Sequence, residues 1–327
     1  MTITLDTPPI LIARRQPPQL EQVEALLASQ VDGTRSPLEA ALAQLIAAGG
    51  KRIRPRLVLL MGGLLAVDPA PLLYLAAAIE MLHTATLVHD DLVDGASLRR
   101  GVETLNARAS AAASVLVGDF AFTRAARLVL ATGSLSAVDM FTEAMATIVN
   151  GELTQIARPR GIANREEYFD WIGAKTAALF ELSTGAPALL SQSGMEDASS
   201  ARRFGYAIGM AFQIMDDVLD FTSDAAHLGK PSGQDLRQGI LTLPALIYLE
   251  AHPDDPSLRL LINRQRLPEA DLVQLVDSIR QGNSIQQAIE VAQGFVNDGL
   301  SALDQLPDGL ERSELEKIAR SVVDRHG

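Results

Sequence analysis

The chain has 327 residues, of which 47% are hydrophobic and 21% are charged, and these values predict a globular protein with a sizeable core. A formal net charge of −12 argues against a general nucleic-acid binder, because such a protein needs a basic face. The chain contains no cysteine, which excludes disulfides, thiolate metal sites and cysteine nucleophiles and suits the reducing cytoplasm, where we expect the protein.

The first 18 residues differ in character from the rest of the chain. Segment 1–18 contains four prolines and no helical periodicity, which predicts a loose arm. It lacks the basic-then-apolar order of a signal peptide. The apolar run at 57–67 is interrupted by glycine and is shorter than the roughly 18 residues of a membrane helix. We therefore expect no integral membrane segment.

From residue 19 onward, apolar residues recur at the three- and four-residue spacing of amphipathic helices. The apolar residues are mostly Ala and Leu, which favour helix, and no alternating run rich in Val, Ile or Thr predicts a strand. No linker is long or polar enough to divide the chain, so we predict one all-α domain over 19–327. The predicted helices cover 20–30, 37–48, 54–66, 69–94, 103–131, 135–157, 166–193, 198–222, 239–251, 268–280, 284–304 and 311–325.

Two clusters of aspartate stand in otherwise apolar helical stretches. The first comprises Asp90, Asp91 and Asp94, and at about 100° per residue His83 shares a stripe with the outer two. The second, which lies 126 residues further on, comprises Asp216, Asp217 and Asp220, and Gln213 shares their face. Carboxylates this close repel one another, and a divalent cation removes the repulsion. A solvated patch or a helix cap would explain one such cluster, whereas two favour metal binding.

Basic residues suited to phosphate stand at isolated places in this acidic chain, namely at Lys51, Arg54, Arg99, Arg100, Lys175 and Lys230. For Arg52 and Arg56 we expect ordinary solvated positions. Lys175 is the only charge between Asp170 and Glu181, and an unpaired ammonium in an apolar helix is costly, which indicates a functional role. The loop 223–235, which holds Lys230, is long enough to be functional. No G-x-x-x-x-G-K-[ST] loop or G-x-S-x-G elbow points to another chemistry.

These motifs match those of a known family. The segments GGKRIRPRL, HTATLVHDDLVDGASLRRG, VLVGDF, NGELTQ, KTAALF, MAFQIMDDVLDF and LGKPSGQDLRQGILTLP follow one another from about residue 49 to residue 244. In this order they resemble the trans (E-type) polyprenyl diphosphate synthases. The resemblance implies an isoprenoid-synthase bundle around a deep apolar cavity, usually a homodimer, that joins isopentenyl diphosphate to an allylic diphosphate with Mg²⁺.

The resemblance also implies roles for individual residues. The expected metal ligands, for three Mg²⁺ ions, are Asp90, Asp91, Asp94, Asp216 and Asp220. The expected catalytic residues are Lys175, Thr176, Gln213 and Lys230. The expected substrate-binding residues are Lys51, Arg54, His83, Arg99, Arg100 and Asp217. In the implied mechanism pyrophosphate leaves, the isopentenyl double bond attacks the allylic cation, and a proton is lost to the released pyrophosphate.

One residue departs from the family pattern, and product length is less well specified. Gly95 follows Asp94 where many members carry an acidic residue. Ala85 and Thr86 are small, so the expected product has the geranylgeranyl length or longer, and Phe141, Met145 or Ile148 would form the next barrier or be plain core residues. A class I terpene cyclase and a non-catalytic subunit of a two-component synthase are the alternatives. Cyclases normally mix Asn, Ser or Thr and Glu in the second motif, and such subunits tend to lose one cluster.

Overall fold

The structure is a computed structural model, and it describes residues 18–31, 36–99, 102–158, 160–191, 195–222 and 232–324. Its elements are α1 (Pro18–Ser29), α2 (Pro37–Ala47), α3 (Ile53–Leu64), α4 (Pro69–Val93), β1 (Leu98–Arg99), β2 (Val102–Glu103), α5 (Leu105–Arg108), α6 (Ala111–Leu130), α7 (Leu135–Ala157), α8 (Arg165–Ile172), the π-helical turn η1 (Gly173–Ala177), α9 (Ala178–Ala188), α10 (Met195–Thr222), α12 (Gln234–Arg237), α13 (Leu243–Ala251), α14 (Pro256–Ile262), α15 (Glu269–Gln281), α16 (Ser284–Leu303) and α17 (Leu310–Ser321). The predicted all-α class is confirmed.

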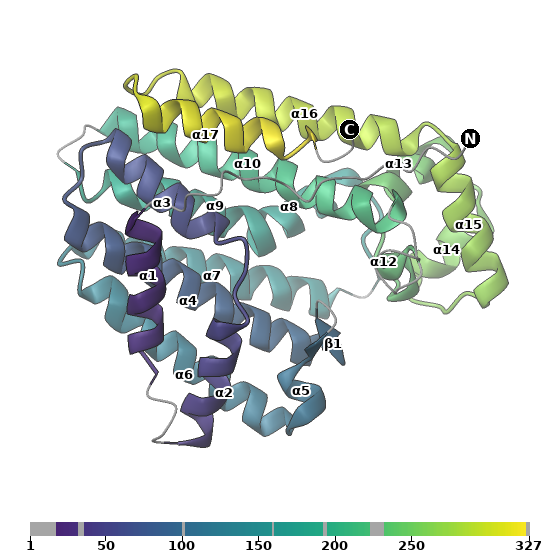
Figure 1. Cartoon of the computed structure of the whole chain (residues 1–327). Coiled ribbons are helices and arrows are strands. Elements are labelled where there is room, and N and C mark those ends of the chain that lie inside the picture. Colours follow the sequence, from purple (N-terminus) through teal and green to yellow (C-terminus); the bar gives the residue numbers. More distant parts are fainter. Residues whose placement is uncertain are drawn as a thin grey trace, which may run out of the picture.

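The helices form stacked layers. Helices α10, α16 and α17 run along one side of the molecule, α4, α6 and α7 lie beneath them, and α12 to α15 gather at one end (Figure 1). Helix α4 packs against α1, α3, α6 and α9, while α10 packs against α9, η1 and α16. One hydrophobic cluster includes residues from Leu20 in α1 to Val322 after α17. The helices that carry the two aspartate clusters, α4 and α10, are therefore both central to the core.

Helix α4 passes a membrane-span test by length and composition. The stretch Pro69–Val93 contains a window of 18 residues with a mean hydropathy of 1.4, so the sequence does hold an apolar run that our expectation overlooked. In the structure 61% of that window is buried against neighbouring helices. The apolar character of α4 is accounted for by its place in the core.

The predicted helix over 103–131 is wrong at its amino-terminal end. Thr104 accepts a hydrogen bond from the backbone N–H of Ala107 and so caps the short α5, and its hydroxyl donates to the carbonyl of Ala96 at 2.6 Å. Ser110 then caps α6. Side-chain caps at these two positions replace helical hydrogen bonds and start separate helices. Before α5, β1 and β2 form a two-residue antiparallel pair, a strand element that the pattern did not predict.

Other boundaries also differ from the prediction. The stretch 166–193 is divided by η1, the π-helical turn that contains Lys175, and π-turns in helices often occur at functional sites. The predicted loop at 252–257 ends in the unpredicted α14, because Asp255 caps that helix and Pro256 occupies its first position. The predicted arm at 1–18 lies outside the described residues, apart from Pro18 at the start of α1.

Candidate active site

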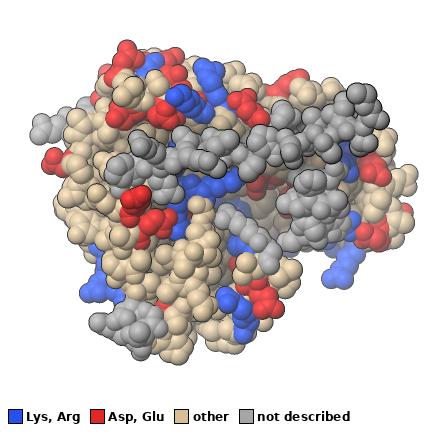
Figure 2. Space-filling view, viewed as in Figure 1, with Lys and Arg blue, Asp and Glu red and all other residues tan. Residues whose placement is uncertain are grey.

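The two aspartate clusters meet at one cleft. The carboxyl-terminal end of α4, η1 and α10 all contribute to a cleft of about 740 Å³, whose lining includes Asp94, Lys175, Gln213 and Asp217. Basic and acidic side chains lie together in the hollow at the middle of the face in Figure 2. The two clusters are far apart in the sequence, but the fold brings them together because α4 and α10 are both core helices. The predicted site residues Lys230 and Arg100 lie outside the described residues.

Helix α4 ends within the first cluster, at a left-handed glycine. Gly95 has φ +62, its N–H donates to the carbonyl of Leu92 at 3.2 Å, and the N–H of Ala96 donates to the carbonyl of Asp91 at 2.9 Å. This pair of bonds is a Schellman termination, which favours glycine because a Cβ is strained at positive φ. The departure of Gly95 from the family pattern thus ends the helix directly after Asp94.

Within the first cluster the aspartates have different partners. Asp91 is buried, and its Oδ1 accepts a hydrogen bond from Nε of Arg99 at 2.8 Å. Burial raises the pKa of Asp90 to about 6, with Glu152 and Asp94 adding to the rise and Lys175 opposing it. Asp90 therefore faces both a cation and further carboxylates. Arg99, expected to hold substrate, is held by Asp91 in this structure.

Lys175 is paired, contrary to the unpaired ammonium that its apolar surroundings indicated. Its Nζ lies 3.0 Å from Oε1 of Glu152 on α7 and 5.4 Å from the ring centroid of Trp171. Burial lowers the pKa of Lys175, but Asp90 and Glu152 raise it further, so the net shift is upward. The side chain remains a cation at the cleft, where Glu152 and Asp90 approach it from two helices.

The second cluster is organised by a chain of hydrogen bonds. Tyr168 on α8 donates to Oδ2 of Asp217 at 2.5 Å, and Nε2 of Gln213 donates to Oδ1 of the same carboxylate at 2.7 Å. The hydroxyl of Thr176 in turn donates to Oε1 of Gln213 at 2.7 Å. Burial raises the pKa of Asp217 well above its ordinary value. Asp217 is thus a buried anchor for Gln213 and Thr176, with both its oxygens engaged by protein donors.

The other two aspartates of the second cluster differ in their surroundings. The two carboxylate oxygens of Asp220 accept from the backbone N–H groups of Gln234 and Asp235 at 3.0 and 3.1 Å, so Asp220 holds the start of α12. This places Asp235 beside the cluster. Burial raises the pKa of Asp235 to about 7, and Asp220 and Asp216 add to the rise. Asp216 itself is exposed.

The resemblance implies that Lys51, Arg54, His83 and Arg100 hold isopentenyl diphosphate. The three of these that the structure describes lie on α3 and α4 or just before α3, and none of the three lines the cleft described above. Lys51 is exposed and precedes α3, while His83 is half-buried on α4. The guanidinium of Arg54 lies 4.9 Å from the ring centroid of Phe180. Arg52, expected at a solvated position, is buried and paired with Glu24 and Glu80, so that expectation is wrong.

Sequence reasoning missed three residues of this site. Glu152 lies in the NGELTQ segment, and its charge next to the segment's apolar residues was the available signal. Asp235 is the last residue of the predicted loop 223–235, and an acidic residue in a polar loop gives no signal of its own. Tyr168 has no exposed surface, and nothing in helical periodicity distinguishes a tyrosine that binds a carboxylate from one that fills the core. A buried tyrosine hydroxyl does, however, need a partner.

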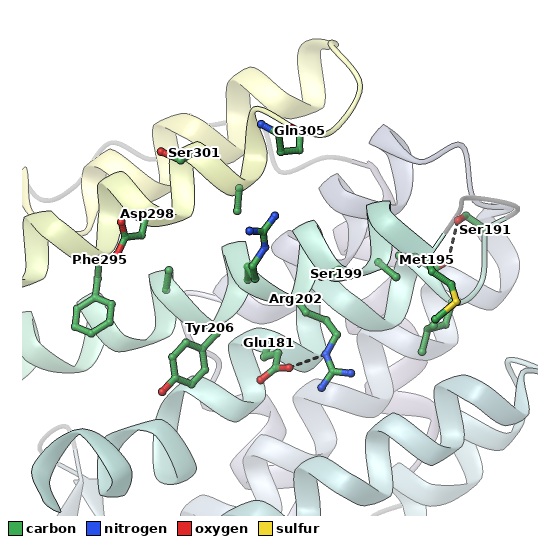
Figure 3. A pocket seen from close by; sticks show the side chains of 16 residues that line it. Glu181, Ser191, Met195, Ser199, Arg202, Tyr206, Phe295, Asp298, Ser301 and Gln305 are labelled. Carbon is green, nitrogen blue, oxygen red and sulfur yellow. Dashed lines mark hydrogen bonds and ion pairs between the residues drawn. The ribbon is translucent and has the colours of Figure 1, made fainter. Parts of the chain in front are cut away.

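A larger hollow, of about 1210 Å³, lies elsewhere, between the α9–α10 corner and α16 (Figure 3). Its lining includes Arg202, which pairs with Glu181 at 2.7 Å, together with Tyr206 and Phe295. No predicted site residue lines it. The convergence of charge assigns the chemistry to the smaller cleft.

An all-α bundle that brings two aspartate-bearing helices and a lysine to one cleft has the features of an enzyme acting on diphosphates. The sequence model of the polyprenyl synthetase family matches residues 35–279. The chain is 36% identical over 298 residues to a prenyl transferase of Synechocystis sp. (90% of this chain, 91% of that protein). It is 35% identical over 286 residues to octaprenyl diphosphate synthase of Escherichia coli strain K12 (86% of this chain, 88% of that protein).

Solved structures agree. A polyprenyl synthase from Caulobacter crescentus CB15, complexed with calcium and isoprenyl diphosphate, has a TM-score of 0.87 and 33% identity over 94% of this chain and 95% of that chain. A decaprenyl diphosphate synthase from Rhodobacter capsulatus has a TM-score of 0.86 and 32% identity over 94% of this chain and 96% of that chain. This chain belongs to the polyprenyl synthetase family and is a prenyltransferase, a polyprenyl diphosphate synthase.

Proposed function

We propose that the protein is a Mg²⁺-dependent trans-prenyltransferase that condenses isopentenyl diphosphate head-to-tail with an allylic diphosphate. The product is a linear polyprenyl diphosphate of geranylgeranyl length or longer. The observation that carries this proposal is the meeting of Asp94, Lys175 and Gln213 at one cleft, with Asp90 and Asp216 close by in the same helices. We also expect a cytoplasmic location, on the cysteine-free composition.

The donor set fits Mg²⁺. Asp90, Asp94 and Asp216 offer hard carboxylate oxygens. Burial raises the pKa values of Asp90 and Asp235, and neighbouring carboxylates add to the rise. Among the described residues no three acidic or histidine side chains converge closely enough to hold a metal by themselves. Mg²⁺ usually takes one or two protein carboxylates and completes its shell with water and substrate phosphate, so the carboxylates of α4 and α10 are suitable ligands.

We assign three Mg²⁺ ions to the site, held by Asp90 and Asp94 on one side and Asp216 on the other. When bound, the metal neutralises charge on the leaving diphosphate. Asp91 and Asp220 were expected as metal ligands, and Asp217 was expected to bind substrate. Because Arg99, backbone N–H groups, and Tyr168 with Gln213 engage these three carboxylates, we propose that they mainly orient neighbouring groups of the site.

The remaining residues hold the substrates. Lys175, Arg99 and Lys230 bind the allylic diphosphate, and the cation at Lys175 stabilises charge as pyrophosphate departs. Gln213 and Thr176 lie beside the reacting carbon, with orientations fixed by their hydrogen bonds. The isopentenyl diphosphate is held by Lys51, Arg54, His83 and Arg100. The isopentenyl double bond then attacks the allylic cation, and the proton passes to the released pyrophosphate.

The apolar side of the site sets product length. Ala85 is buried on α4 shortly before the first cluster. Because alanine is small, this position leaves room for a growing prenyl chain. Phe141 and Ile148 of α7 are buried, and Met145 between them packs against the core. These three are our proposed next barrier to chain growth.

We further propose that the active form is a homodimer. Large apolar side chains stand exposed on α6 and α7: Val115, Leu116, Leu130, Leu135, Val149, Leu153 and Ile156. On α7 the last three recur at four- and three-residue spacing, which makes a stripe along one helix face. A second copy of the chain covering this stripe would remove it from water.

The test is incubation of the purified chain with labelled isopentenyl diphosphate, separate allylic starters and Mg²⁺, followed by dephosphorylation and chromatographic sizing. We expect a linear ladder that ends at one length and is lost with EDTA or in Asp90→Ala. Cyclic hydrocarbon would favour a terpene cyclase. If the folded chain makes no product alone but activates a partner, it is a regulatory subunit, and the proposal fails.

A further inference from the structure

Arg52 is a buried arginine at the junction of four helices. Only 7% of its surface is exposed. Its Nε donates to Oε1 of Glu24 on α1 at 2.6 Å, and its Nη1 donates to Oε1 of Glu80 on α4 at 2.7 Å. Its Nη2 donates to Oε2 of Glu24 at 3.1 Å and to the carbonyl of Ile46 on α2 at 3.0 Å. The planar guanidinium therefore joins α1, α2 and α4 at the start of α3.

Such a cluster is better suited to fixing geometry than to adding stability. Removing charges from water is costly, so a buried ion pair contributes little net stability even when its hydrogen bonds are good. The forked donors of arginine, by contrast, specify the direction of each partner. Burial lowers the pKa of Arg52, but Glu24 and Glu80 outweigh it and keep the guanidinium charged.

The backbone at Arg52 is held in an uncommon conformation. Arg52 has φ 47 and ψ 39, in the left-handed region, and it is the residue directly before α3, with no side chain capping that helix. A residue other than glycine stays in this region only where its surroundings hold it there. The four hydrogen bonds of the guanidinium supply that constraint, so they also fix the path of the chain into α3.

The residues on either side of this anchor are those proposed for isopentenyl diphosphate. Lys51 precedes Arg52 directly, and Arg54 is the second residue of α3. On α4, Glu80 lies one turn before His83, so its bond to Arg52 ties the two segments that carry the substrate-binding side chains. A shift of the Arg52 guanidinium would move Lys51 and Arg54 relative to His83.

We propose that Arg52 is a positioning residue, which sets Lys51 and Arg54 against His83 for binding isopentenyl diphosphate through its bonds to Glu24 and Glu80. This inference rests on the proposed function. It predicts a selective effect: loss of the anchor weakens use of isopentenyl diphosphate while use of the allylic substrate, bound by the aspartate clusters, changes little.

The test is steady-state kinetics of Arg52→Lys, which keeps the charge but loses the fork. We expect the KM for isopentenyl diphosphate to rise roughly 10- to 100-fold, with the KM for the allylic diphosphate changed by less than about twofold. Glu80→Gln is the second variant, in case Arg52→Lys does not fold, and it should give the same selective rise. A fall in kcat alone, or equal rises in both KM values, would overturn the proposal, because a merely structural role predicts those results.

Arg312→Lys is the matched control. Arg312 of α17 likewise donates hydrogen bonds to the carboxylates of Asp304 and Asp308 and to the carbonyl of Leu306. The Arg312→Lys substitution should leave both KM values unchanged. Lys51→Ala distinguishes the proposed substrate-binding role of Lys51 from the positioning role of Arg52. If it leaves the KM for isopentenyl diphosphate unchanged, the substrate assignment is wrong and the positioning role falls with it. If it raises that KM and Arg52→Lys does not, only the positioning role is overturned.

Discussion

The two aspartate clusters have the same sequence motif, DDxxD, but their side chains have different partners. In the first, on α4, the helix ends at Asp94, and Asp91 accepts a hydrogen bond from Arg99. In the second, α10 continues past the cluster, Asp217 is held by Tyr168 and Gln213, and Asp220 is held by the backbone of α12.

A DDxxD motif therefore does not by itself assign a role to each of its aspartates. Burial and neighbouring donors decide which carboxylates remain available to a metal and which become anchors. In the first cluster two aspartates remain available, Asp90 and Asp94. In the second, Asp216 is the exposed carboxylate, and Asp235 of α12 lies beside the cluster.

The largest effect should come from the aspartates that face the cleft. Asp90→Asn should lower kcat by on the order of 100-fold or more, and raise the Mg²⁺ concentration needed for half-maximal rate, because a metal ligand is lost. Measuring rate against Mg²⁺ concentration checks this. Asp139→Asn, an exposed aspartate of α7, is the control. A normal rate for Asp90→Asn at ordinary Mg²⁺ concentrations would break the comparison.

Removing a residue that orients a buried aspartate should lower kcat less than removing a metal ligand. Tyr168→Phe removes the donor to Oδ2 of Asp217. We expect kcat to fall roughly tenfold, as for other residues that orient a ligand, and the free energy of unfolding to fall by about 1–3 kcal/mol. Rate assays and chemical denaturation measure the two quantities. Tyr248→Phe, on α13, where the ring stacks on His252, is the control and should change neither quantity. An unchanged kcat in Tyr168→Phe would show that the hydrogen-bond chain has no role.

The end of α4 offers a smaller effect on stability. Gly95→Ala places a Cβ at φ +62, where no atom lies within 4 Å of it, so strain and not a clash sets the cost. We expect a loss of about 1–2 kcal/mol in the free energy of unfolding. Gly294→Ala, inside α16 and also in open space, should instead be neutral or stabilising. Equal losses in the two variants would contradict the role given to the left-handed turn.

The smallest effect concerns pH. The pKa values of Asp90 and Asp235 are raised to about 6 and about 7, so the folded protein binds protons more tightly than the unfolded chain. Their contribution to stability is therefore present at low pH and lost as pH rises through these values. The melting temperature of the metal-free protein should fall by a few degrees between about pH 5 and about pH 8.

The slope with pH can be assigned by comparison. The fall in melting temperature with pH should be smaller in Asp235→Asn. It should be smaller again when Mg²⁺ and pyrophosphate are present, because cations then compensate the charge of the carboxylates. Differential scanning fluorimetry at several pH values is sufficient. A melting temperature that rises over this range, with a slope unaltered by Asp235→Asn, would show that these carboxylates are not the repelling groups.

Much of the fold followed from local pattern. Long helices with apolar stripes, such as α7, were predicted at their observed bounds, since helical periodicity is strong over many residues. The breaks at Thr104 and Ser110 were missed, because a side-chain cap inside an apolar stretch has the same periodicity as a helix. The π-turn at Lys175 was missed for a similar reason: one extra residue in a turn leaves no compositional mark.

For the site, residue types were predictable but contacts were not. The aspartates, Lys175 and Gln213 stood out as polar residues in apolar sequence. Their partners did not, because Glu152 and Tyr168 come from helices that only the fold brings near. Arg52 shows the limit most clearly: its burial depends on Glu24 and Glu80, which lie 28 residues away on either side in the chain.

In the proposed mechanism both aspartate clusters act on one diphosphate through bound metal. Calorimetric binding of an unreactive allylic thiolodiphosphate, with and without Mg²⁺, in the native protein, Asp94→Asn and Asp216→Asn tests this. We expect that tight binding requires Mg²⁺ and is weakened by each substitution separately. Binding that is equally tight in EDTA, or that depends on only one cluster, would contradict it.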